Sequence, residues 1–128
     1  MDKFTFFDLR VYQEAKQLVK DVYSLLEKFP RFETYAMGDQ LRRAVVSVAS
    51  NIAEGSGRFS TKEKIHFIEI AYGSLTETLC QLDIAHDLGY VSEEEFNTVK
   101  ERTNTIAKQL SGLRASFQKQ LGPTTPTR

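Results

Sequence analysis

The sequence has one cysteine, Cys80, no tryptophan, three prolines and two histidines among its 128 residues. A single cysteine cannot form a disulfide within the chain, which excludes the disulfide-stapled class of small secreted domains. No apolar run approaches the roughly 20 residues that a membrane-spanning helix needs. The first ten residues, MDKFTFFDLR, lack the charged, apolar and small-residue regions of a signal peptide. We therefore expect a cytoplasmic protein with no membrane partner.

The charges balance overall but are unevenly distributed. Seventeen basic and 17 acidic residues give a net charge of zero, and the isoelectric point is near 6.7. A dedicated nucleic-acid-binding domain usually has a value above about 9, so only a local basic patch is compatible with that function. Residues 65–99 contain no Lys or Arg, whereas residues 100–128 are strongly basic. We expect these two segments to attract each other if they pack side by side.

Four stretches repeat apolar residues at steps of three and four, and no stretch alternates as a β-strand does. The expected helices run from Asp8 to Phe29, from Asp39 to Glu54, from Ser60 to Gly89, and from Ser92 to residue 121. The rows expected to face the core are Tyr12, Ala15, Val19, Val22, Leu26 and Phe29; Leu41, Val45, Val48 and Ile52; Ile68, Tyr72, Leu75, Leu79 and Leu82; and Phe96, Val99, Thr103, Ile106, Leu110, Leu113 and Phe117.

Local signals predict where these helices begin and end. Asp8 is the expected N-cap of the first helix. Ser60 and Ser92 each open an S-x-x-E capping box. Pro30 ends the first helix, because the residue before a proline disfavours the helical region. Gly55 is expected to end the second helix in the left-handed conformation.

Two further features bear on packing. In the connection of residues 31–38, the apolar side chains of Phe32, Tyr35 and Met37 are expected to cap the core. Gly73 lies inside the third helix, where glycine costs about 1 kcal/mol relative to alanine. We expect that position to permit the close approach of another helix.

Short connections place sequential helices beside each other in opposite directions. The sequence therefore predicts an all-α, up-down-up-down antiparallel four-helix bundle over residues 1–121. The last residues, 122–128, contain two prolines and no apolar side chain, and we expect a disordered tail.

The helix of residues 39–54 is apolar on two sides. One row begins at Leu41, and Val46, Ala49 and Ala53 form a second row on another side. A surface helix has a single apolar stripe. This pattern predicts a second partner surface, most simply another copy of the chain.

Polar residues between the two apolar rows need partners if the helix is buried. We expect Arg43 to pair with Glu77 of the third helix, and Asn51 to bond backbone near the Gly55 turn. These three residues, together with Glu54 and Arg58, are interpreted first as a structural polar network.

Basic residues surround the break that follows this helix. Gly55-Ser56-Gly57-Arg58 follows a helix and lacks the spacing of a P-loop, which excludes that motif. The N-terminus of the next helix is able to hold an anion. The candidate nucleic-acid-binding residues are Arg42, Arg58, Lys62 and Lys64.

Metal and catalytic sites find little support in the residue pattern. Asp83 and His86 form half of a bundle-type metal motif with a shortened acid, and two histidines in all argue against a metal centre. Cys80 lacks a neighbouring base within reach on its helix. We expect a non-enzymatic protein without metal or cofactor.

Three stretches together resemble one known family: QLRRAVVSVASNIAEGSGRFSTKE (40–63), FIEIAYGSLTETLCQLDIAHDLGY (67–90) and FDLRVYQEAKQLVKDVY (7–23). The family consists of bacterial four-helix bundle proteins named after reading frames in intervening sequences of 23S ribosomal RNA genes. The resemblance implies a homopentamer of largely unknown cellular role. A distant similarity links the family to the accessory variability protein of diversity-generating retroelements, which binds nucleic acid and a reverse transcriptase.

The sequence and the resemblance together suggest an oligomeric scaffold or adaptor. The basic patch, repeated once per subunit, predicts RNA or DNA as a partner, because ring symmetry multiplies a modest local charge. The alternative is a purely structural or protein-binding module that uses the acidic stretch from Glu69 to Glu95.

Overall fold

The computed structural model describes residues 2–122 and consists of helices joined by short connections, with no strand in that range. Its all-helical class confirms the sequence prediction. The proposed tail lies outside the described residues except for Gly122. The elements are η1 (Thr5–Asp8), α1 (Arg10–Leu26), η2 (Arg31–Glu33), α2 (Met37–Ser56), α3 (Thr61–Asp87) and α4 (Glu93–Leu121), where η denotes a short 3-10 helix.

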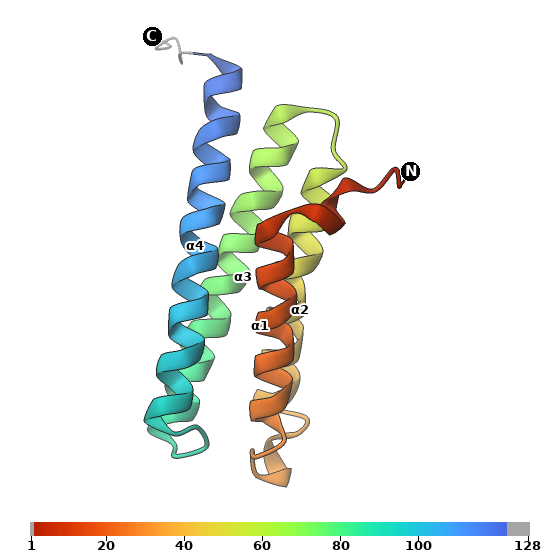
Figure 1. The fold of residues 1–128 in the computed structure, drawn as a ribbon. Helices are drawn as coiled ribbons and strands as arrows, with labels where there is room; N and C mark the ends of the chain where they lie inside the picture. The colour runs from red at the N-terminus through yellow and green to blue at the C-terminus, as the bar shows by residue number, and fades with distance from the viewer. Residues whose placement is uncertain (1, 123–128) are drawn as a thin grey trace, which may run out of the picture.

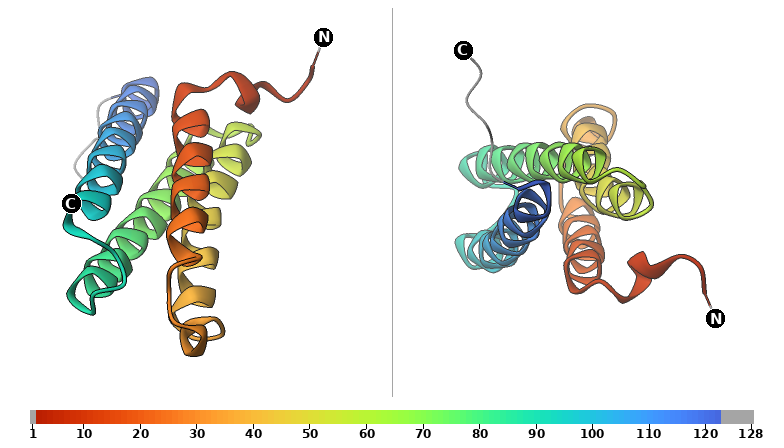
Figure 2. Two further views of the ribbon diagram at one scale, coloured as in Figure 1. Left: turned by 60° about the horizontal axis from the view of Figure 1, so that its bottom comes forward. Right: turned by 90° about the horizontal axis from the view of Figure 1, so that it is seen from above.

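Each long helix packs against two others around a common core. α2 contacts α1 and α3, and α4 also contacts α1 and α3. Seen from above, α1 and α4 lie on the same side of α3 (Figure 2). The N-terminal segment with η1 crosses the end of the bundle at which α2 connects to α3 (Figure 1). This end therefore brings three separate parts of the chain together.

The core is aliphatic, and the heptad-like row of α4 was predicted correctly. Val99, Thr103, Ile106 and Leu110 are buried, while the outer members of the row pack against the core at its edges. In α1 the buried face is turned relative to the prediction. Its fully buried residues are Val11, Ala15, Leu18, Val22 and Leu25.

The α1 prediction was right in part, because Ala15 and Val22 are buried and the other predicted residues pack against the edge of the core, and the difference arises because this helix carries two neighbouring apolar rows. Val19 and Leu26 are half-buried beside the core, and Leu18 and Leu25 point into it. A helix that contacts two neighbours turns the middle of its wide apolar face toward the bundle axis. Periodicity alone does not reveal which row lies at that middle.

Capping chemistry was the most accurate local signal. Ser92 and Glu95 form the complete reciprocal capping box at the start of α4. Ser60 accepts a 3.0 Å hydrogen bond from the backbone N–H of Glu63 at the start of α3. The prediction for Asp8 is wrong, because Asp8 belongs to η1 and Leu9 precedes α1 without a side-chain cap. The 3-10 turn replaces the expected capped start.

Two glycines have roles opposite to those expected. Gly55 is buried inside α2, which continues to Ser56, so it does not end the helix in the left-handed conformation. A Cβ atom at Gly55 would lie 2.8 Å from Cβ of Phe67, and glycine is therefore required for the close approach of α2 and α3. At Gly73 an added Cβ would meet no atom within 4 Å. No other helix of the described chain approaches Gly73.

The connection between α1 and α2 also differs from expectation. Phe32 and Tyr35 are 75% and 90% exposed, so they do not cap the core, whereas Met37 packs against it. Glu33 in η2 accepts a 2.9 Å hydrogen bond from the Tyr90 hydroxyl. This contact turns the polar side of η2 toward the bundle, and its aromatic neighbour Phe32 faces solvent.

Ion pairs join α4 to both of its neighbours. Arg114 contacts Glu69 of α3 at 2.6 Å, as the opposite charges of the two segments led us to expect. Arg102 contacts Glu14 and Asp21 of α1 at 2.7 and 2.8 Å. The second cluster was not anticipated, and it anchors α4 to α1.

The start of α4 makes stability depend on pH. Hydrogen bonds from Lys28 and from the backbone N–H of Ser92 hold the pKa of Glu95 below its ordinary value of 4.5. Because the carboxyl group of Glu95 has a lower pKa in the folded protein than in the unfolded chain, its ionised form stabilises the fold at pH values above the unfolded-state pKa. This stabilisation is lost as the pH falls through the folded-state pKa. Glu95→Gln should lower the denaturation midpoint at neutral pH and flatten its acid dependence below pH 4.5. Parallel urea melts of both proteins across this range check the prediction, and equal acid slopes would contradict it.

Candidate nucleic-acid interface

The structure does not place all four candidate basic residues together. Arg42 lies near the start of α2 and donates hydrogen bonds to the Thr34 carbonyl at 2.8 Å and to Asp39 at 3.2 Å. Because a helix rises about 1.5 Å per residue, Arg42 is roughly 20 Å from Ser56 at the far end of α2. Arg42 thus secures the start of its own helix and does not join the other candidates.

Arg58, Lys62 and Lys64 do lie together, at the turn between α2 and α3. The Arg58 guanidinium lies 3.5 Å from Glu54 and 4.0 Å from Glu63, and its centre is 4.5 Å from the Phe67 ring centroid. Acidic neighbours therefore offset much of its charge.

The two lysines of this turn differ in exposure. Lys62 is exposed, and within residues 2–122 its side chain makes no hydrogen bond or ion pair. Lys64 is half-buried and donates a 3.1 Å hydrogen bond to the Ser56 carbonyl. Of the four candidates, only Lys62 projects freely into solvent.

Aromatic side chains near this turn were missed by sequence reasoning. Phe59 is fully exposed, and Phe4 is 65% exposed. A groove of about 550 Å³ runs between the N-terminal segment and the end of α2. We call it the end groove; it is lined by Lys3, Phe4, Thr5, Phe6, Ser50, Ala53, Glu54, Ser56, Gly57 and Arg58. Phe59 could have been recognised, since it belongs to no apolar row and adjoins Arg58.

The expected polar network takes another form. The Arg43 side chain is 80% exposed and pairs with Asp39 at 3.1 Å, so the prediction of a buried pair with Glu77 is wrong. Asp39 lies one turn away on the same helix, within easy reach of Arg43. Glu77 is exposed on α3. Glu54, the remaining predicted member, contacts Arg58 at the end of α2.

Asn51 belongs to a seam that joins α2 to α3. Its side-chain amide donates to the Ser47 carbonyl at 2.8 Å and to the Ser47 hydroxyl at 2.9 Å, so it does not bond the Gly55 turn as predicted. The Ser47 hydroxyl is 2.8 Å from that of Ser74. Small hydroxyl side chains at this seam satisfy one another and let the two helices pack closely.

A partly apolar surface lies outside this seam, on the sides of α2 and α3 that face away from the core. Val46, Ile70 and Ile84 are 40%, 37% and 44% exposed on it. Gly73 and Cys80 are exposed in the same row of α3. We call the outward sides of these two helices together the α2–α3 outer face; it comprises Arg43, Val46 and Ser50 of α2 and Ile70, Gly73, Glu77, Cys80 and Ile84 of α3.

The outward side of α4 has a different character. Its exposed positions over residues 100–119 are mostly charged or polar, including Lys100, Glu101, Asn104 and Lys108. Leu121 is the large exposed hydrophobic residue of α4 in the described chain. Since a solvated helix face is normally polar, the α2–α3 outer face is the unusual one.

The residues considered for catalysis or metal binding are dispersed. Within residues 2–122 no three His, Cys, Asp or Glu side chains are grouped as metal ligands. The His86 ring stacks on Phe96 with centroids 5.1 Å apart, which gives it a packing role. Cys80 is exposed and does not lie against the core. No helix in the described range is long and apolar enough to cross a membrane.

Comparisons with known proteins identify the family. The sequence pattern of the 23S rRNA-intervening sequence protein family matches residues 7–112, from η1 through most of α4. A crystal structure of a protein of unknown function from the S23 ribosomal protein family of Bacteroides thetaiotaomicron has the same fold. Its TM-score is 0.75 at 20% identity, covering 81% of this chain and 97% of that one. The comparison with curated proteins gave no match. The chain belongs to the 23S rRNA-intervening sequence protein family.

Proposed function

We propose that this protein is a non-enzymatic, cytoplasmic scaffold that assembles from copies of itself through the α2–α3 outer face. Its unit is an up-down-up-down antiparallel bundle. The observation that supports this proposal is the exposure of Val46 on the outward side of α2 and of Ile70 and Ile84 on the outward side of α3, while the outward side of α4 is polar. Exposed apolar residues grouped on one face mark interaction surfaces.

The chemistry of the face favours another copy of the chain as its occupant. Ser50 and Gly73 have small side chains, which allow a second helix to approach closely. Arg43 and Glu77 are both exposed there and carry opposite charges. A surface that carries both signs of charge, with apolar residues between them, allows one part of the face on one copy to meet a different part of the face on the next. The family resemblance implies five copies, and such a head-to-tail contact closes into a ring.

Cys80 provides a native probe of this assembly. Its thiol is exposed in the single chain and lies in the same row as Gly73 and Glu77. Self-association should slow its reaction with a maleimide, and dilution below the association range should restore the fast rate. The unfolded protein in denaturant gives the reference rate for a free thiol. A rate that stays fast at every protein concentration contradicts the proposed interface.

A second candidate function is binding of single-stranded RNA or DNA at the turn between α2 and α3, beside the end groove. It is favoured by one observation, the fully exposed Phe59 beside Arg58 and Lys62. Proteins that bind single strands combine cations with aromatic side chains on which bases stack. In a ring, this combination would recur once per subunit.

Substitution of Phe59 tests this second function. Phe59→Ala should weaken binding of a single-stranded RNA at low salt by about 1–3 kcal/mol, the contribution of one stacked base. Filter binding measures it, with Phe32→Ala at the opposite end of the bundle as the matched control. Failure of the unmodified protein to retain RNA or DNA rules out the nucleic-acid function and leaves the assembly proposal intact.

A further inference from the structure

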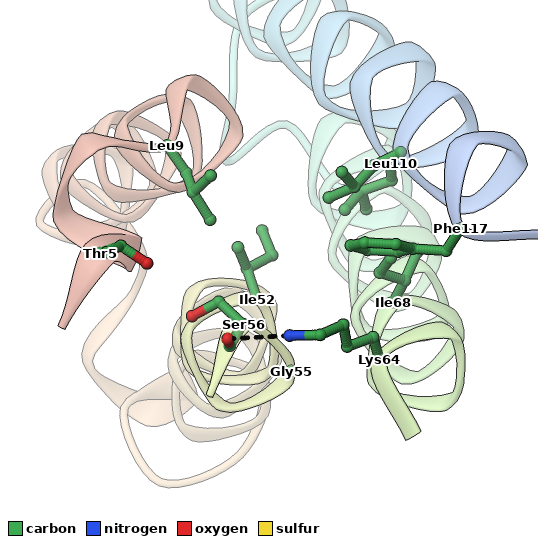
Figure 3. A pocket seen from close by; sticks show the side chains of 10 residues that line it. Thr5, Leu9, Ile52, Gly55, Ser56, Lys64, Ile68, Leu110 and Phe117 are labelled. Carbon is green, nitrogen blue, oxygen red and sulfur yellow. Dashed lines mark hydrogen bonds between the residues drawn. The ribbon is translucent and has the colours of Figure 1, made fainter. Parts of the chain in front are cut away.

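A compact, partly open cavity lies at the end of the bundle beneath η1. Its volume is about 190 Å³. Leu9 of the N-terminal segment, Ile52 of α2, Ile68 of α3, and Leu110 and Phe117 of α4 point toward it (Figure 3). Thr5, Gly55, Ser56, Lys64 and Leu113 complete the lining. The cavity is distinct from the end groove, although both include Thr5 and Ser56.

The cavity follows from local sequence. Ser56 presents little side-chain volume at the end of α2, where a larger residue would fill the space. Phe117 closes the far side from the last part of α4 (Figure 3). Apolar cavities of about 150 Å³ stay dry and bind benzene in other proteins. This space is therefore large enough for a single ring.

Lys64 gives the cavity one charged group. Its Nζ lies 3.1 Å from the Ser56 carbonyl and 6.0 Å from the Phe117 ring centroid. An ammonium group has three donors, and the Ser56 carbonyl occupies one of them. Within residues 2–122, no carboxylate comes within ion-pairing distance of Lys64. The Ser56 carbonyl is neutral, so the positive charge of Lys64 stays uncompensated.

We propose that this cavity binds a small monocarboxylate with a compact apolar body, of the size of benzoate. The ring would lie among Ile52, Ile68 and Phe117, and the carboxylate would accept hydrogen bonds from Lys64. A negatively charged acceptor compensates the positive charge of the ammonium group, whereas the neutral Ser56 carbonyl does not. The volume is too small to enclose a long acyl chain, and a single cation at the lining disfavours phosphate esters.

Titration of the full chain with benzoate, followed by amide NMR shifts, tests the proposal. Shifts should centre on Gly55, Ser56 and Lys64, and the neutral analogue benzyl alcohol should bind at least about tenfold more weakly. Lys64→Met keeps the apolar stem and removes the charge, so benzoate affinity should fall at least about tenfold. Lys62→Met is the matched control on the exposed neighbour and should leave the affinity unchanged.

A second variant tests whether benzoate binding needs the open space of the cavity, without changing the charge of Lys64. Leu113→Trp adds bulk from the half-buried rim, and it should abolish benzoate binding while the circular dichroism spectrum stays helical. Three outcomes overturn the proposal: no shifts up to about 10 mM benzoate, a concentration that would nearly saturate a site with a Kd of about 1 mM; equal binding of benzyl alcohol; or undiminished binding to Lys64→Met. None of these outcomes bears on assembly through the α2–α3 outer face.

Discussion

Replacement of Ile70 by glutamate should dissociate the protein into folded single chains. Ile70 is 37% exposed in the single chain and lies on the side of α3 opposite the core. A carboxylate at that position remains solvated in the isolated bundle and changes its stability little. Between two copies, the same carboxylate would be buried without a partner, at a cost of about 3–5 kcal/mol per contact.

Light scattering at matched protein concentrations measures this effect. Asn104→Glu is the matched control, because it adds the same charge to an exposed, polar position on α4. The control should keep the mass of the unmodified protein, and both variants should retain helical circular dichroism. An unchanged mass for Ile70→Glu would place the contact between copies elsewhere on the molecule.

Replacement of Gly55 by alanine should lower the free energy of unfolding by about 1–2 kcal/mol. The added Cβ would lie 2.8 Å from Cβ of Phe67, which sits on the backbone of α3 and has no freedom to rotate away. Overpacking of this kind costs about 1–3 kcal/mol. The better helix propensity of alanine offsets at most about 1 kcal/mol. The two helices must therefore separate slightly along their whole contact.

Gly112→Ala is the control for this prediction. Gly112 also lies inside a helix, but a Cβ there would meet no atom within 4 Å. Its replacement should raise the free energy of unfolding by up to about 1 kcal/mol. Urea denaturation of the two variants, at one protein concentration so that assembly contributes equally, should show opposite signs. If Gly55→Ala is as stable as Gly112→Ala, the close contact between α2 and α3 is not formed.

The sequence predicted features that depend on neighbouring residues. The capping box of Ser92 and Glu95 uses groups three residues apart, and the α4 row from Val99 to Leu110 repeats without an adjacent competing row. Both are determined within a few turns of one helix. The four helices were consequently placed to within a few residues.

Features that depend on distances between helices were not predictable in this way. Gly55 and Gly73 both interrupt helices in the sequence, and only the spacing of α2 and α3 shows that Gly55 is the one in close contact. Arg43 could have paired with Asp39 of its own helix or with Glu77 of α3, and it pairs with Asp39.

The candidate site shows the same limit. The cluster of Arg58, Lys62 and Lys64 is local in sequence and was found. Its relation to Phe4 and Lys3 depends on where the N-terminal segment crosses the bundle. The inward position of Lys64 depends on the end of α4, more than 40 residues away.

The central claim is that the α2–α3 outer face is covered by other copies of this chain. The mass of the unmodified protein in solution tests it most directly. Light scattering coupled to size exclusion should give a mass several times the 14.6 kDa of one chain, and near five times that value if the ring has the size that the family resemblance implies. A mass of 14.6 kDa, unchanged on raising the protein concentration, would contradict the account.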